Sequence, residues 1–282
     1  MDMVYTTIVS HYCNGVVVIL IIMDMVYTCL HDDPQYGVLA RRAQNSNIRF
    51  RKFQRLLMAS IRIMTVQFDK ELRHGEVPLF RGAVIGAAGE QHTMFHNHTA
   101  TGFVYRYPLI QYRSFGRRAA IVCINEGIEQ MQALFGGNFL VGDLMLGSTN
   151  KGKIAVESIR VHEFRLSELD ASVRYHIARW IPFNQSNYKE WQAAESPEER
   201  LHKIESILAG NIISFAKGVG WQIENRFTLS IVPDSIHTLK CRFKGQMLIA
   251  LSLDFEVGLF LPSGIGLGKG VVLNHGVVFP AK

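Results

Sequence analysis

The order of strands and helices between residues 61 and 164 constrains the fold of this chain most strongly. Ile61–Phe68 alternates between apolar and polar residues, as a half-buried strand does. Pro78 suits the first turn of a helix, and Gly116 joins two strand-like runs into a hairpin. The predicted elements are strand 61–68, helix 78–88, strands 107–115 and 117–124, a helix from Asn125 as its cap to Phe135, and strand 153–164. This β-α-β-β-α-β order is that of a ferredoxin-like domain.

The second half of the chain partly repeats this pattern. Ser196 is a suitable helix cap, and Pro197 suits the first helical position. The predicted elements are helices at 188–191 and 197–219 and strands at 227–232, 238–243, 247–260 and 270–279. We therefore expect a second α+β domain, with domains at 58–166 and 167–282.

The first 57 residues differ in character from the rest. The hexapeptide Met1–Thr6 recurs at Met23–Thr28, and the apolar run Gly15–Met23 between the two copies is too short to cross a bilayer. Arg41–Arg55 is basic and contains no acidic residue. It fits an RNA-binding arm, a solvated extension, or a reading frame whose true start is Met58 or Met64. We expect residues 1–57 to be an N-terminal extension outside the fold.

Charge and cysteine content limit the partners and the compartment. The 282 residues carry a formal net charge of +6, which suits an anionic partner such as a nucleic acid without selecting one. The four cysteines are widely spaced and form no CxxC pair, so neither a disulfide framework nor a structural zinc site is expected. We expect a cytoplasmic protein with free thiols and no membrane partner, in which Cys123 is a small buried apolar residue.

His96 and His98 are the candidate catalytic pair. In an extended segment, two residues separated by one position point to the same face. Imidazoles can act as general base and general acid near neutral pH, and RNA supplies its own nucleophile, the 2′-OH. The alternatives are two surface histidines, or two metal ligands beside Glu90, for which no third ligand is suitably spaced. No metal or other cofactor is expected.

A glycine-rich segment near the end of the chain is the candidate phosphate-binding loop. It contains Gly264, Gly266, Gly268, Lys269 and Gly270. Glycine lets the backbone come close to an anion, and Lys269 adds a positive charge. The spacing is not that of a P-loop, and the segment precedes a strand, unlike a dinucleotide fingerprint. A tight structural turn remains the alternative.

Tyrosine and arginine are interleaved after the histidine pair. Tyr105, Tyr107 and Tyr112 stand beside Arg106 and Arg113. Such a pattern suits base stacking and phosphate contact. The alternative is a tyrosine-rich strand that packs in the core.

Taken together, these segments resemble a known family, the CRISPR-associated repeat endoribonucleases of the Cas-six family, b-type branch. The resemblance covers about residues 60–278 and rests on the segments 77–83, 95–98, 107–112, 210–218 and 266–270. It implies two tandem ferredoxin-like (RNA-recognition-motif-like) domains. It also implies metal-independent cleavage of CRISPR precursor RNA within each repeat, leaving a 2′,3′-cyclic phosphate and a 5′-hydroxyl.

The resemblance also assigns roles to residues. It implies that His96, His98 and Tyr105 support cleavage, and that the glycine-rich segment 264–270 holds the RNA backbone. The expected partners are the CRISPR precursor RNA and a multi-subunit interference complex, for a monomer or a homodimer. Two alternatives stay open: a catalytically silent RNA-binding member of the same fold, and an unrelated ferredoxin-like enzyme whose glycine loop holds a small phosphate.

Overall fold

The structure is a computed structural model that describes residues 60–88, 95, 98–99, 102–103, 107–136 and 142–281. Met58–Lys282 forms one compact unit. The predicted extension 1–57 lies outside the described residues.

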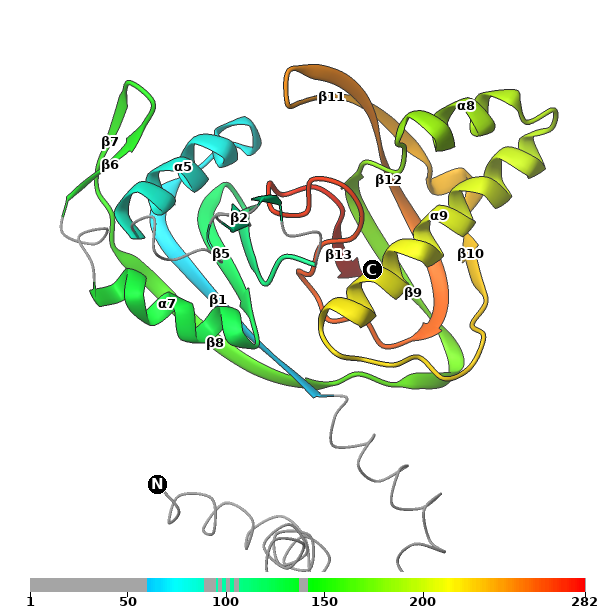
Figure 1. The fold of residues 1–282 in the computed structure, drawn as a ribbon, viewed down its shortest axis with the longest axis horizontal. Helices are drawn as coiled ribbons and strands as arrows, with labels where there is room; N and C mark the ends of the chain where they lie inside the picture. Colours follow the sequence, from blue (N-terminus) through cyan, green and yellow to red (C-terminus); the bar gives the residue numbers. More distant parts are fainter. Residues whose placement is uncertain are drawn as a thin grey trace, which may run out of the picture. The chain divides into compact units, whose positions relative to one another are not determined.

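The first half of this unit has ferredoxin-like topology (Figure 1). Its elements are β1 (Ser60–Glu71), η1 (His74–Glu76), α5 (Val77–Ala88), β2 (His98–Thr99), β3 (Gly102–Phe103), β4 (Ile110–Phe115), β5 (Arg118–Ile124), α7 (Glu126–Gly136), β6 (Asp143–Leu146), β7 (Thr149–Lys153) and β8 (Val156–Arg165). The main sheet has the antiparallel order β4-β5-β1-β8. The four main strands therefore lie in the order second, third, first, fourth, as the β-α-β-β-α-β pattern predicts.

Helix periodicity decides which residues of α5 face the sheet. Val77, Phe80, Val84 and Ala88 recur every three or four residues and are buried. They share a core with the face of β1 that carries Met64 and Val66 and with α7. The other face of β1 packs against the second half of the chain.

The second half repeats the topology with one change. Its elements are β9 (Glu168–Trp180), α8 (Gln185–Ala193), α9 (Pro197–Gly218), β10 (Leu229–Ile231), η3 (Pro233–Ser235), β11 (His237–Phe243), β12 (Gln246–Leu259) and β13 (Val277–Pro280). The strand order is β10-β12-β9-β13, and β11 also pairs with β12. Where a ferredoxin-like domain has its second helix, this half has the loop 260–276.

Several local predictions are confirmed and others are wrong. The Ser196 hydroxyl caps α9 by accepting the N–H of Glu199 (3.1 Å), and Cys123 is fully buried. Asn125 precedes α7, but its side-chain oxygen accepts the N–H of Arg62 in β1 (2.9 Å), so it ties the helix start to the sheet. The strand predicted at 270–279 is confined to β13, because residues 270–276 turn through left-handed conformations at Gly270, Asn274 and Gly276.

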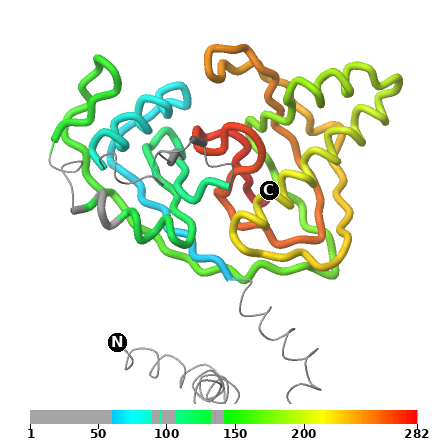
Figure 2. The backbone as a smooth tube through the Cα atoms, viewed as in Figure 1, coloured from blue at the N-terminus to red at the C-terminus, as the bar shows by residue number. Residues whose placement is uncertain are grey.

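The two halves share one core. Tyr107 of the first half packs edge-to-face on Phe215 of α9, with ring centroids 5.1 Å apart. A Cβ atom at Gly218 would lie 2.1 Å from the Cβ of Tyr107, so only glycine allows this approach. The loop 260–276 lies between β4 and α9 (Figures 1 and 2), and the N–H of Tyr112 donates to Val272 O (3.0 Å).

Candidate functional site

The predicted catalytic segment is only partly described. His98 is in β2, where it pairs with Phe103 of β3 in an antiparallel arrangement. His96, Tyr105 and Arg106 lie outside the described residues, as does the side chain of His98. The roles of these four residues stay predictions.

The glycine-rich loop is held by its own backbone hydrogen bonds. The N–H of Gly264 donates to Val278 O and that of Leu267 to Gly276 O, both at 2.8 Å. Gly264 and Gly266 are buried. The prediction that these two glycines contact RNA is therefore wrong, and the first part of the loop extends the pairing of β13. Gly268 and Gly270 are partly exposed and Lys269 is exposed.

Arg113 is a structural residue and not an RNA contact. Its side chain has no exposed surface. It donates to the carbonyl oxygens of Val271 (2.6 Å), Tyr112 (3.2 Å) and Gly264 (3.4 Å), and to the side chain of Gln111. Burial lowers the pKa of Arg113 to about 10, so it stays charged at neutral pH. Our prediction that Arg113 contacts RNA is wrong: the guanidinium joins β4 to the glycine-rich loop.

Tyr107 continues this buried polar cluster. Its hydroxyl donates to Gly266 O and accepts from the Nε2 of Gln111, both at 2.9 Å. Tyr107 and Tyr112 are both buried. The core alternative is therefore confirmed for these two tyrosines.

Gly268 lets the loop approach the buried side chain of Trp180 and the partly buried side chain of Asn211. A Cβ atom there would lie 2.6 Å from the indole nitrogen of Trp180 and 2.7 Å from Oδ1 of Asn211, and its φ is +83°. The indole N–H donates to that oxygen (2.9 Å). The close approach that glycine permits at this position is to the protein itself.

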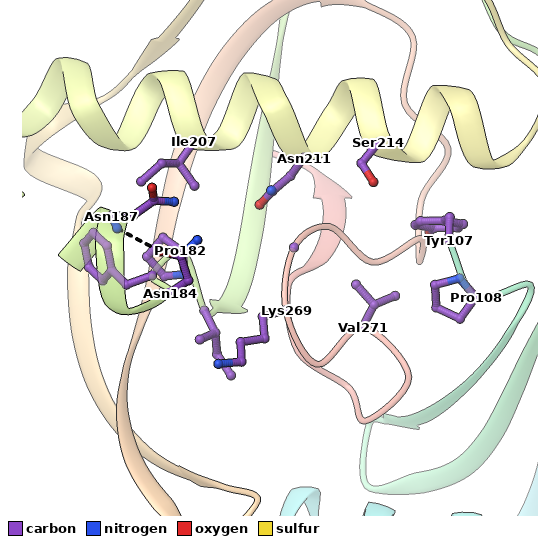
Figure 3. A pocket seen from close by; sticks show the side chains of 13 residues that line it. Tyr107, Pro108, Pro182, Asn184, Asn187, Ile207, Asn211, Ser214, Lys269 and Val271 are labelled. Atoms are coloured by element: carbon purple, nitrogen blue, oxygen red, sulfur yellow. Dashed lines mark hydrogen bonds between the residues drawn. The ribbon is translucent and has the colours of Figure 1, made fainter. Parts of the chain in front are cut away.

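A pocket of about 490 Å³ opens where this loop meets α8 and α9 (Figure 3). Apolar and polar side chains line it together. The lining residues are Tyr107, Pro108, Ile181, Pro182, Phe183, Asn184, Asn187, Ile207, Asn211, Ser214, Gly268, Lys269 and Val271. The ammonium group of Lys269 also lies 5.6 Å from the ring centroid of Phe243, within cation–π range. The pocket is of a size that binds a small organic group.

A second polar cluster joins the two halves beside the loop. The Nε of Arg179 donates to the Nε2 of His74 (3.0 Å), and the other ring nitrogen of His74 contacts the amide of Asn274 (3.0 Å). The His74 and His275 rings meet edge-to-face with centroids 5.0 Å apart. Because an arginine can only donate, Nε2 of His74 must keep its lone pair and the ring is neutral.

Acid is expected to weaken this junction. Burial, and then the charges of Arg179 and His275, lower the pKa of His74 from 6.5 to about 4. Between these values the unfolded chain binds a proton that the folded chain does not, so this contribution to stability is complete above about pH 6.5 and is lost as the pH falls toward about 4. The variant His74→Gln keeps an acceptor for Arg179 but does not titrate. Urea unfolding at several pH values should show a smaller acid loss of unfolding free energy for this variant than for the wild type.

The control for this titration is His202→Gln, because the His202 side chain is 87% exposed. It should retain the wild-type pH dependence. If His74→Gln also retains it, another group causes the acid sensitivity.

Sequence reasoning missed most of this site. We did not single out Asn184, Arg179 or His74, and Asn211 entered only as part of the segment 210–218. Single asparagines, arginines and histidines in separate segments form no local motif. Trp180 and Asn211 meet only after the β9–α8–α9 connection folds back on itself.

A group of three or more His, Cys, Asp or Glu side chains able to hold a metal is absent from the part of the chain that the structure describes. In the same part, no helix is both long enough and apolar enough to cross a membrane.

Comparison with known proteins agrees with this architecture. Two tandem ferredoxin-like domains of this arrangement occur in a structure described as the crystal structure of Cas6b, with a TM-score of 0.70 and 21% identity. The structure of a CRISPR RNA processing endoribonuclease, also Cas6b, has a TM-score of 0.60 and 18% identity. Each comparison covers 79% of this chain and 100% of the other.

Family models for the two Cas6b domains match most of the chain. The N-terminal domain model matches residues 59–164, and the C-terminal domain model matches residues 167–281. This chain therefore belongs to the Cas6b family. A protein of Methanocaldococcus jannaschii, the uncharacterized protein MJ0978, is 26% identical over 120 residues, which are 43% of this chain and 79% of that protein.

Proposed function

We propose that this chain is a metal-independent endoribonuclease that cleaves CRISPR precursor RNA within its repeats. The observation that carries the proposal is the match of both Cas6b domain models, one to each half of the chain. The fold is shared with a protein described as a CRISPR RNA processing endoribonuclease. In the proposed organisation, residues 1–57 are an extension, 58–166 carry the histidine pair, and 167–282 carry the glycine-rich loop.

The proposed chemistry needs only a base and an acid. One histidine of the pair, His96 or His98, takes the proton of the RNA 2′-OH, and the oxygen attacks the neighbouring phosphorus. The other protonates the 5′-oxygen as the bond to phosphorus breaks. The products are a 2′,3′-cyclic phosphate and a 5′-hydroxyl. Tyr105 supports this step.

Exposed groups of the second half would hold the RNA backbone. Gly268, Lys269 and Gly270 form the accessible part of the loop, and Arg106 would add a positive charge from the first half. The ammonium of Lys269 is free to meet a phosphate, because its described contact is with an aromatic ring. The processed RNA would then pass to a multi-subunit interference complex.

Cleavage of a labelled repeat RNA tests this proposal. We expect the rate to be unchanged by EDTA, because no step uses a metal. We expect no cleavage of an RNA with a 2′-deoxy group at the mapped cut site, because that RNA lacks the nucleophile.

Two other outcomes would replace the proposal. Loss of cleavage in EDTA would indicate a metal-dependent nuclease. Binding of both RNAs without cleavage of either would support the catalytically silent alternative.

A further inference from the structure

The pocket beside Lys269 contains two asparagine side chains whose oxygen atoms are already used. Asn184 caps α8: its Oδ1 accepts the backbone N–H of Asn187 (2.8 Å). Asn211 of α9 accepts the indole N–H of Trp180 through its Oδ1 (2.9 Å). Both donors are N–H groups that cannot accept, so each asparagine must present its oxygen to its partner.

The fixed orientation of these amides leaves their NH2 groups for a ligand. Among the described residues, no group accepts a hydrogen bond from the Nδ2 of Asn184 or Asn211. The Nζ of Lys269 is a third donor at the same pocket. Asn187 and Ser214 also line the pocket, and each can either donate or accept. The side chains of the pocket therefore offer a ligand more hydrogen-bond donors than acceptors.

The walls of the pocket suit a flat, uncharged ring. Pro108, Ile181, Pro182, Ile207 and Val271 supply apolar surface. A phosphate placed among them would lose its hydration, whereas a base would bury its faces favourably. In Figure 3, Asn211 and Ser214 project from α9 toward the loop that carries Lys269 and Val271.

We propose that this pocket binds one unpaired RNA base that carries a carbonyl oxygen. The amides of Asn184 and Asn211 would donate to the base edge, and Lys269 would contact a neighbouring phosphate. Guanine, uracil and cytosine each carry a carbonyl oxygen, whereas adenine carries none and presents an amino donor instead. The pocket thus selects against adenine. This inference rests on the proposed function, because it assumes that RNA is the ligand.

A pair of oligonucleotides tests the carbonyl group. Inosine has a carbonyl oxygen in place of the amino group of adenosine and an N–H in place of its N1 acceptor, so hexainosinate and hexaadenylate differ only at this base edge. We expect the wild type to bind hexainosinate about 10-fold more tightly than hexaadenylate, as measured by fluorescence anisotropy with labelled RNA. Hexauridylate and hexacytidylate then show which carbonyl-bearing base fits best.

Three variants remove an NH2 donor while keeping the internal hydrogen bonds; the two Asp variants leave no donor, and Asn184→Ser leaves only a shorter hydroxyl. Asn184→Asp and Asn184→Ser keep an oxygen that can cap α8, and Asn211→Asp keeps an acceptor for Trp180. Each should abolish the preference for hexainosinate by weakening its binding about 10-fold. Asn184→Ser does so without adding charge. Gln192→Glu adds one negative charge to an exposed position of α8 and should retain the preference.

The results separate this inference from the proposed function. Equal binding of hexainosinate and hexaadenylate by the wild type would overturn it, as would variants that weaken both RNAs equally. Failure of every hexamer to bind would overturn it as well. In all three cases, metal-independent cleavage of the repeat RNA would still support the nuclease, whereas loss of that cleavage with the base preference intact would count against the nuclease alone.

Discussion

His96→Ala and His98→Ala are each expected to cleave repeat RNA about 10²–10⁴-fold more slowly than the wild type. The reason is that each variant loses one of the two groups that move a proton in the transition state. RNA affinity should change little, because the charges that hold the phosphates remain. Single-turnover cleavage with enzyme in excess measures the chemical step, and a filter-binding assay measures the affinity.

The matched control for the histidine pair is His202→Ala. His202 is a highly exposed residue near the start of α9, and its removal should leave the cleavage rate unchanged. Full-speed cleavage by both His96→Ala and His98→Ala would show that the pair is not catalytic. A loss of affinity equal to the loss of rate would instead assign the histidines to binding.

Arg113→Met is expected to lower the free energy of unfolding by about 3–5 kcal/mol. The substitution leaves buried acceptors without donors, among them Val271 O and Gly264 O, and each unpaired buried group costs about 1–3 kcal/mol. The Gln111 side chain also loses its partner. Urea unfolding followed by circular dichroism measures the change.

Arg118→Met is the control for this substitution. Arg118 is exposed, and it donates to the carbonyl oxygen of Asp69 (2.7 Å) at the surface. Its loss should change the unfolding free energy by no more than about 1 kcal/mol, since water can replace the arginine. Equal unfolding midpoints for Arg113→Met and the wild type would show that the buried guanidinium does not hold the loop.

The first half of the fold was predictable because apolar residues in its segments recur with the spacing typical of strands or helices. β1 alternates, α5 has apolar residues every three or four positions, and β4 and β5 meet at Gly116. The hairpin β6–β7 was missed, since β6 has only four residues and β7 is almost entirely polar.

β9 was missed for a different reason. Its first residues are largely polar and exposed, although Val173, Tyr175 and Ile177 alternate as a strand does. That alternation was a usable signal. Without β9, the strand order of the second half cannot be assembled, because β12 and β13 both pair with it.

Site residues were harder to predict because both faces of β4 are buried, so apolar and polar residues do not alternate along this strand as they do in a half-exposed one. In β4, Tyr112 faces the core of the first half and Arg113 faces the glycine-rich loop, so both are buried. A basic residue beside an aromatic one normally suggests a surface for nucleic acid. Here the arginine donates hydrogen bonds to backbone carbonyls of a segment about 150 residues away in the chain. A pattern of neighbouring residues cannot reveal such a long-range contact.

The hydrogen bonds of the glycine-rich loop have a consequence for the thermodynamics of binding. A loop with many glycines is commonly flexible and loses conformational entropy when a ligand orders it. In this chain the loop is ordered by its own pairing with β13, by Arg113, and by the close packing of Gly268 on Trp180. That entropy is lost during folding, so a ligand meets a surface whose shape is already set, and more of its contact energy remains as affinity.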